Sequence, residues 1–174
     1  MSPRLTGAVA VIAYALVIVL ANVATDRFGL VPIGLGLMVT AGTFFAGAAL
    51  ILRDWVQLTT ARWVTFAAIM GGAALSYFLS SPALALASGL AFLVSELVDY
   101  GVFTPLRGRN LAGAVVVSSV VSAPVDTVLF LWLAGFPLTW QAVIGQFIVK
   151  TLMALAVAAA VTYRERQRCS TSPA

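Results

Sequence analysis

Six long apolar segments, separated by short polar connectors, make up most of the chain. They lie at about 5–25, 30–52, 64–80, 83–103, 110–134 and 140–162. Each has roughly the 20 residues that an α-helix needs to cross a bilayer. Because the connectors are short, successive helices are expected to be antiparallel neighbours. The pattern predicts an all-α polytopic membrane protein, with six transmembrane helices in a single domain over 1–163 and a polar tail over 164–174.

The first apolar segment also has some features of a signal peptide. Arg4 precedes the apolar stretch, and small residues around Ala21 and Ala24 resemble a cleavage site. The stretch is long for the apolar core of a signal peptide, and it carries Tyr14 and Asn22. We therefore expect it to stay in the protein as the first transmembrane helix.

Composition excludes a water-soluble domain, because 61% of the residues are hydrophobic and only 9% are charged. The net charge of +4 does not indicate nucleic acid, since the basic residues sit in short caps between apolar segments. In a six-helix arrangement one side of the membrane receives Arg4, Arg53, Arg62, Arg107, Arg109, Arg164, Arg166 and Arg168. The other side receives only Arg27. The positive-inside rule then predicts both termini, and the tail, in the cytoplasm.

Several kinds of chemistry are excluded by residue type. The chain has no His and a single Cys, Cys169, so a disulfide framework, a Cys/His metal site and His-based catalysis are ruled out within it. It also lacks a glycine-rich phosphate-binding loop followed by Lys and Ser or Thr. We expect no enzyme activity, no cofactor and no metal.

Polar residues inside the apolar segments recur at helical spacing. Lipid does not solvate such side chains, so stripes on several helices indicate a shared interior surface. The candidate substrate-binding residues are Asn22, Thr40, Thr43, Glu96, Ser122, Asp126, Gln146 and Lys150. The spacing predicts that these side chains converge on one internal cavity.

The buried charges carry the strongest expectations. At ~1.5 Å per helical residue, Glu96, Asp126 and Lys150 lie at similar depth on consecutive helices. Asp126 and Lys150 are expected to form an ion pair, which fits either a structural lock between two helices or part of a site. Glu96 has no obvious cation nearby, which makes it the acid expected to meet the substrate. Asp99 is expected to pair with Arg107 or Arg109 near the cytoplasmic boundary.

Residues that interrupt helices suggest that two of the segments, the second and the fifth, are discontinuous. Gly34, Gly36 and Gly42 surround Thr40 in the second segment, and Pro124 lies between Ser122 and Asp126 in the fifth. Interrupted helices in corresponding places of two halves are typical of transporter binding sites. Pro124 is also expected to kink the fifth helix, because it cannot donate a backbone hydrogen bond.

Taken together, these segments resemble the queuosine precursor transporter family, also called the vitamin uptake transporter (VUT) family. The matching stretches are Ala21-Asn22, Thr40–Phe45, Arg53-Asp54, Asp99–Arg107, Ser118–Phe130, Gln146 and Lys150. One departure is Gln57, where many members have Glu. The resemblance implies a six-helix bacterial inner-membrane protein that takes up deazaguanine precursors of the tRNA base queuosine.

The polar residues are compatible with such a ligand. A carboxylate accepts two parallel N–H bonds from a guanine-like edge, a role for Glu96 or Asp126. Donors to the ring carbonyl are Lys150, Gln146 or Asn22. The rings available for stacking are Phe44, Phe45, Tyr100 and Phe130.

A second reading is a membrane-embedded binding subunit of an ATP-driven vitamin importer. Such a subunit would dock an ATPase module through small residues, and Gly42 with Ala46 is one candidate pair. In both readings the partners are the lipid bilayer and a small purine-like solute, with no nucleic acid. A homodimer is compatible with either.

Overall fold

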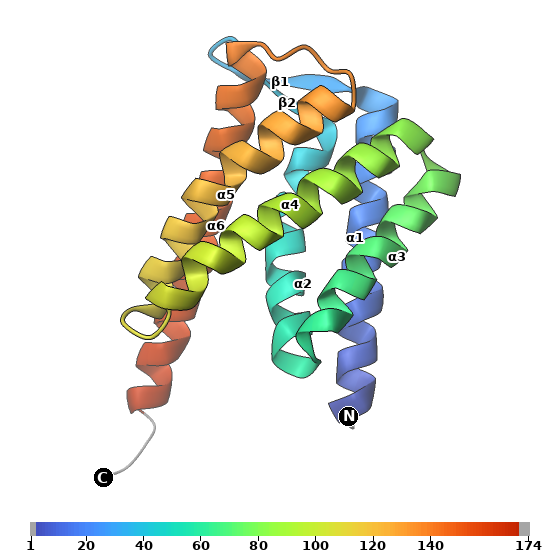
Figure 1. Ribbon diagram of the computed structural model, residues 1–174. Coiled ribbons are helices and arrows are strands. Elements are labelled where there is room, and N and C mark those ends of the chain that lie inside the picture. The colour runs from blue at the N-terminus through green and yellow to red at the C-terminus, as the bar shows by residue number, and fades with distance from the viewer. Residues whose placement is uncertain (1–2, 171–174) are drawn as a thin grey trace.

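The computed structural model describes residues 3–170, with six α-helices, a two-stranded sheet and one 3-10 helix in that range. The elements in chain order are α1 (Pro3–Phe28), β1 (Leu30–Gly34), β2 (Leu37–Thr40), η1 (Ala41–Phe45), α2 (Ala46–Thr59), α3 (Arg62–Leu79), α4 (Pro82–Leu106), α5 (Leu111–Leu133) and α6 (Trp140–Ser170). The chain runs up and down between two ends of the bundle. Both ends of the described chain lie at the end opposite the β hairpin (Figure 1).

Helix α1 shows how the bundle sorts its side chains. Ala10, Tyr14 and Ile18 are buried, at four-residue steps along one face. On the opposite face Ile12, Leu16 and Leu20 are each at least half exposed. Large exposed apolar residues at helical spacing are what lipid contact requires and what water disfavours. The polar Asn22 and Thr25 continue the buried face, so this helix presents its polar groups to the interior.

The expectation of one continuous second helix over 30–52 is wrong. Leu30–Gly34 and Leu37–Thr40 form an antiparallel hairpin instead, with Leu30 opposite Thr40 and Val31 opposite Val39. The turn places Gly34, Leu35 and Gly36 at positive φ, a backbone region that glycine adopts without steric cost. A 3-10 turn follows, and regular helix begins only at Ala46. The glycines of this segment therefore mark a true interruption.

Two glycines let the hairpin and the 3-10 turn pack deep between helices. A Cβ on Gly42 would collide with the Ala21 carbonyl oxygen and the Thr25 hydroxyl of α1. A Cβ on Gly145 of α6 would collide with the Met38 carbonyl oxygen of β2. The non-helical segment is thus fixed between α1 and α6, and its backbone contacts both helices.

The remaining segments lie close to their expected bounds. The fifth segment is one continuous α-helix through Pro124, so the expected interruption is absent there. Three helices within residues 3–170 are long and apolar enough to cross a membrane, at Leu5–Phe28, Pro82–Leu106 and Gly113–Leu133, and two shorter apolar helices lie at Trp63–Leu79 and Trp140–Ala156. Helix α6 continues to Ser170, so the polar tail begins as helix. Six membrane crossings and cytoplasmic termini stay predictions.

Candidate functional site

Two adjoining cavities lie inside the bundle. We call the first the hairpin cavity, of about 100 Å³, because Thr40, Gly42 and Thr43 of the β2–η1 segment form part of its wall. We call the second the arginine cavity, of about 80 Å³, because Arg53 lines it. Each volume holds several water molecules. The two cavities share the wall residues Ala46, Ala49, Phe92, Asp126 and Lys150.

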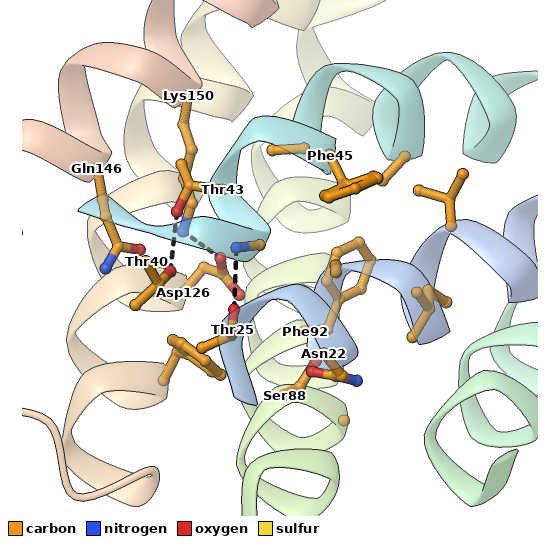
Figure 2. Close-up of a pocket in the computed structure, with 18 of the residues that line it drawn as sticks. Asn22, Thr25, Thr40, Thr43, Phe45, Ser88, Phe92, Asp126, Gln146 and Lys150 are labelled. Atoms are coloured by element: carbon orange, nitrogen blue, oxygen red, sulfur yellow. Dashed lines mark hydrogen bonds and ion pairs between the residues drawn. The ribbon is translucent and has the colours of Figure 1, made fainter. Parts of the chain in front are cut away.

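The hairpin cavity combines aromatic rings with polar side chains (Figure 2). Phe45, Phe92 and Phe130 come from three different elements. The polar lining consists of Asn22, Thr25, Thr40, Thr43, Ser88, Asp126, Gln146 and Lys150. Flat aromatic faces beside a few fixed polar groups are typical of sites for planar heterocycles.

Most of these polar groups are held in place by short hydrogen bonds. Asn22 Nδ2 donates to the Ser76 hydroxyl over 3.0 Å, which leaves the Asn22 carbonyl side toward the cavity (Figure 2). The Thr40 and Thr43 hydroxyls lie 2.9 Å apart. The Thr25 hydroxyl accepts the Gly42 backbone N–H over 2.9 Å, which ties α1 to η1. These bonds orient the acceptors and donors before any ligand binds.

Gln146 is different, because its amide is not fully used. Its side chain is 1% exposed and lines the hairpin cavity, and its Nε2 has no hydrogen-bond partner among the described residues. A buried amide N–H without a partner costs about 1–3 kcal/mol. Such a group is commonly satisfied by water or by a ligand.

The expected ion pair between Asp126 and Lys150 is confirmed. Lys150 Nζ lies 2.5 Å from Asp126 Oδ2 and 3.0 Å from the Thr127 hydroxyl. The side chains are 22% and 14% exposed, respectively. Since both residues line both cavities, the ion pair lies in the wall that the two cavities share.

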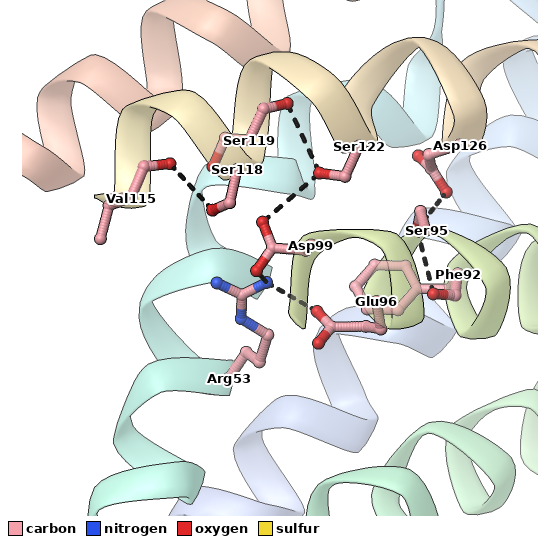
Figure 3. A network of polar contacts seen from close by, with 10 residues as sticks. All are labelled: Arg53, Phe92, Ser95, Glu96, Asp99, Val115, Ser118, Ser119, Ser122 and Asp126. Atoms are coloured by element: carbon pink, nitrogen blue, oxygen red, sulfur yellow. Dashed lines mark hydrogen bonds and ion pairs between the residues drawn. The ribbon is translucent and has the colours of Figure 1, made fainter. Parts of the chain in front are cut away.

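The expectation that Glu96 lacks a cation is wrong. Arg53 Nη1 lies 2.6 Å from Glu96 Oε1 and 3.8 Å from Asp99 Oδ2 (Figure 3). Arg53 also takes the place expected for Arg107 or Arg109 as the cation beside Asp99. It is only 9% exposed, so it is a buried residue of the bundle and not a membrane-surface anchor. The reason is the hairpin, which delays the start of α2 and carries Arg53 into the interior.

The predicted site residues fall into two groups. Asn22, Thr40, Thr43 and Gln146 line the hairpin cavity, and Glu96 and Ser122 line the arginine cavity. Asp126 and Lys150 line both cavities. The single cavity that was expected is therefore divided in two. Sequence reasoning missed Arg53, Thr25 and Ser119. Thr25 had a detectable signal, since it continues the α1 stripe three residues after Asn22.

A family model matches most of the chain. Residues 8–164 match the family model described as "Putative vitamin uptake transporter". The chain belongs to this family. The match covers every residue that lines the two cavities. No curated protein and no solved structure matches the chain.

Proposed function

We propose that this member of the vitamin uptake transporter family imports a small purine-like solute, a deazaguanine precursor of queuosine, across the bacterial inner membrane. The family supports transport as the activity, and it gives no indication of an enzyme. The substrate is inferred from the chemistry of the hairpin cavity.

The observation that carries the substrate class is the pairing of aromatic rings with an unpartnered buried amide. A deazaguanine is flat, so Phe45, Phe92 or Phe130 provides a stacking face. Its ring carbonyl accepts one hydrogen bond, which Gln146 Nε2 has free to donate. Its adjacent N–H donors require acceptors, and the Asn22 carbonyl and the Asp126 carboxylate supply them.

The ion pair gives this site a way to respond to the solute. Asp126 Oδ2 is occupied by Lys150, and Asp126 Oδ1 lies 3.4 Å from the Ser95 hydroxyl. Solute N–H donors that reach Asp126 compete with both partners. Loosening the pair opens the wall between the two cavities, which is a step toward passage through the bundle. In this proposal Glu96 stays paired with Arg53. It lines the arginine cavity, through which the solute then passes.

Uptake into proteoliposomes tests the function. The purified full-length chain is reconstituted, and entry of 7-deazaguanine, guanine, adenine and a non-purine vitamin such as riboflavin is detected by mass spectrometry. We expect saturable uptake of the guanine-like compounds, with the deazaguanine preferred. Uptake of riboflavin alone, or equal uptake in empty liposomes, contradicts the proposal.

The location is tested separately with reporter fusions after Ser170. The arginine asymmetry predicts a cytoplasmic signal at this end of the chain in a bacterial inner membrane. A periplasmic signal contradicts six crossings with cytoplasmic termini.

The ATP-driven alternative gains no support from the proposed docking pair. Gly42 packs against α1 in the interior, and Ala46 lines both cavities. Neither residue is on an outer face where an ATPase module docks. Uptake by the chain alone, without ATP, is the outcome that separates the two functions.

A further inference from the structure

The charges that line the arginine cavity do not balance. Its wall includes three carboxylates and two basic side chains, Glu96, Asp99, Asp126, Arg53 and Lys150. With all five ionised, one negative charge is in excess. A buried charge without a counter-charge costs several kcal/mol, so the cavity favours a positive ligand.

The excess charge belongs to Asp99. Glu96 and Asp126 each have a short ion pair, at 2.6 Å and 2.5 Å. Asp99 is 8% exposed, yet its two contacts are long: Arg53 at 3.8 Å and the Ser122 hydroxyl at 3.4 Å (Figure 3). At 3.8 Å the Arg53 contact is an ion pair without a hydrogen bond, and Arg53 is already bonded to Glu96. Asp99 is therefore the least compensated acid of the cavity.

A second observation concerns Ser119, one turn before Ser122 on α5. Serine hydroxyls inside helices usually bond to a backbone carbonyl one turn earlier, and Ser118 does so with Val115 at 3.3 Å. Ser119 is 8% exposed and lines the cavity, and among residues 3–170 its hydroxyl has no hydrogen-bond partner. The residue is more than nine-tenths buried, and its hydroxyl is open to the negatively charged cavity, where a ligand can bind it.

The chemistry of these groups indicates the charge of that ligand. Carboxylate and hydroxyl oxygens are ligands for hard cations. Within the described chain no group of three or more Cys, Asp or Glu side chains is close enough to hold a metal ion, which disfavours a multivalent one. One carboxylate with neutral oxygens suits a single positive charge.

We infer that the arginine cavity binds one monovalent metal cation, Na⁺, with Asp99 as its carboxylate and the Ser119 hydroxyl beside it. The cation restores neutrality to the five charged groups. The inference goes beyond solute import, because a cation site next to the solute site links uptake to an ion gradient. Arg53 from α2, Glu96 from α4, Asp126 from α5 and Lys150 from α6 are the other charged groups that face the cavity.

The test uses the purified full-length chain without solute, so its outcome is independent of the proposed function. Binding of ²²Na⁺ is measured by scintillation proximity. Asp99→Asn is compared with Asp26→Asn, an exposed acid on α1 outside both cavities. Ser119→Ala is compared with Ser118→Ala, whose hydroxyl bonds to its own helix.

We expect about one ²²Na⁺ bound per chain, lost in Asp99→Asn and weakened about tenfold in Ser119→Ala. Asp26→Asn and Ser118→Ala should bind ²²Na⁺ like the parent.

The inference is overturned if the parent shows no saturable ²²Na⁺ binding, or if the binding does not depend on Asp99. Should Asp99→Asn not be recovered in folded form, the serine pair decides. Equal ²²Na⁺ affinity in Ser119→Ala and Ser118→Ala also overturns the inference.

Discussion

Arg53 Nη1 donates a hydrogen bond to Glu96 Oε1 over 2.6 Å, across 43 positions of sequence. Both side chains are about nine-tenths buried, at 11% and 9% exposure. The pair joins α2 to α4 inside the bundle. Glu96 is therefore a neutralised acid, and not the lone acid that was expected from the sequence.

Removing Arg53 should destabilise the protein more than removing Glu96. Arg53→Gln leaves Glu96 and Asp99 without their shared cation, and breaking a buried pair in this way costs about 3–5 kcal/mol. Glu96→Gln costs less, because Arg53 keeps Asp99 as a partner. Thermal unfolding of the purified variants in detergent measures the difference. Arg27→Gln, which changes an exposed residue, should unfold like the parent.

Variants of the Asp126–Lys150 pair should separate its contribution to stability from its contribution to solute uptake. Asp126→Asn strands Lys150, with a loss of about 3–5 kcal/mol in the free energy of unfolding. Asp126→Asn combined with Lys150→Met removes both charges and should recover most of that loss. Uptake should remain below a tenth of the parent rate in the double variant, because the solute acceptor is gone. Recovery of both stability and uptake would show that the pair is only structural.

Gly145→Ala should disturb the hairpin, since the added methyl group meets the Met38 carbonyl oxygen of β2. Overpacking of this kind costs about 1–3 kcal/mol. Gly71→Ala on α3 is the matched control, because nothing lies within 4 Å of its added Cβ. That change should stabilise the helix slightly, by up to about 1 kcal/mol. Equal unfolding temperatures for the two variants would contradict close packing of β2 against α6.

The sequence was informative where periodicity and depth determine the answer. Asp126 and Lys150 lie at matching depth on adjacent antiparallel helices, so their contact followed from helical rise alone. Arg53 was missed because a regular helix over 30–52 places it at the membrane surface. The hairpin removes that regularity. Its signals were Pro32 and the closely spaced Gly34 and Gly36, which are residues typical of turns, within a segment whose hydropathy alone favours a helix.

The divided cavity could not be predicted in the same way. Helical stripes show which faces are polar, but they do not show how far apart two stripes stand across a bundle. Asn22 and Glu96 both follow such stripes, yet they line different cavities. Their separation depends on Ala46, Ala49 and Phe92, apolar residues whose position in the shared wall follows from packing.

The central claim is that the hairpin cavity binds the solute through Gln146, and uptake by Gln146→Leu tests it most directly. The change removes a buried amide with an unpartnered Nε2, so folding should be unaffected or slightly improved. Losing its hydrogen bond to the solute, about 1–3 kcal/mol, should reduce 7-deazaguanine uptake about tenfold or more. Gln141→Leu, on the same helix but outside both cavities, should transport like the parent. With rates normalised to membrane protein, parent-level uptake by Gln146→Leu would contradict the claim.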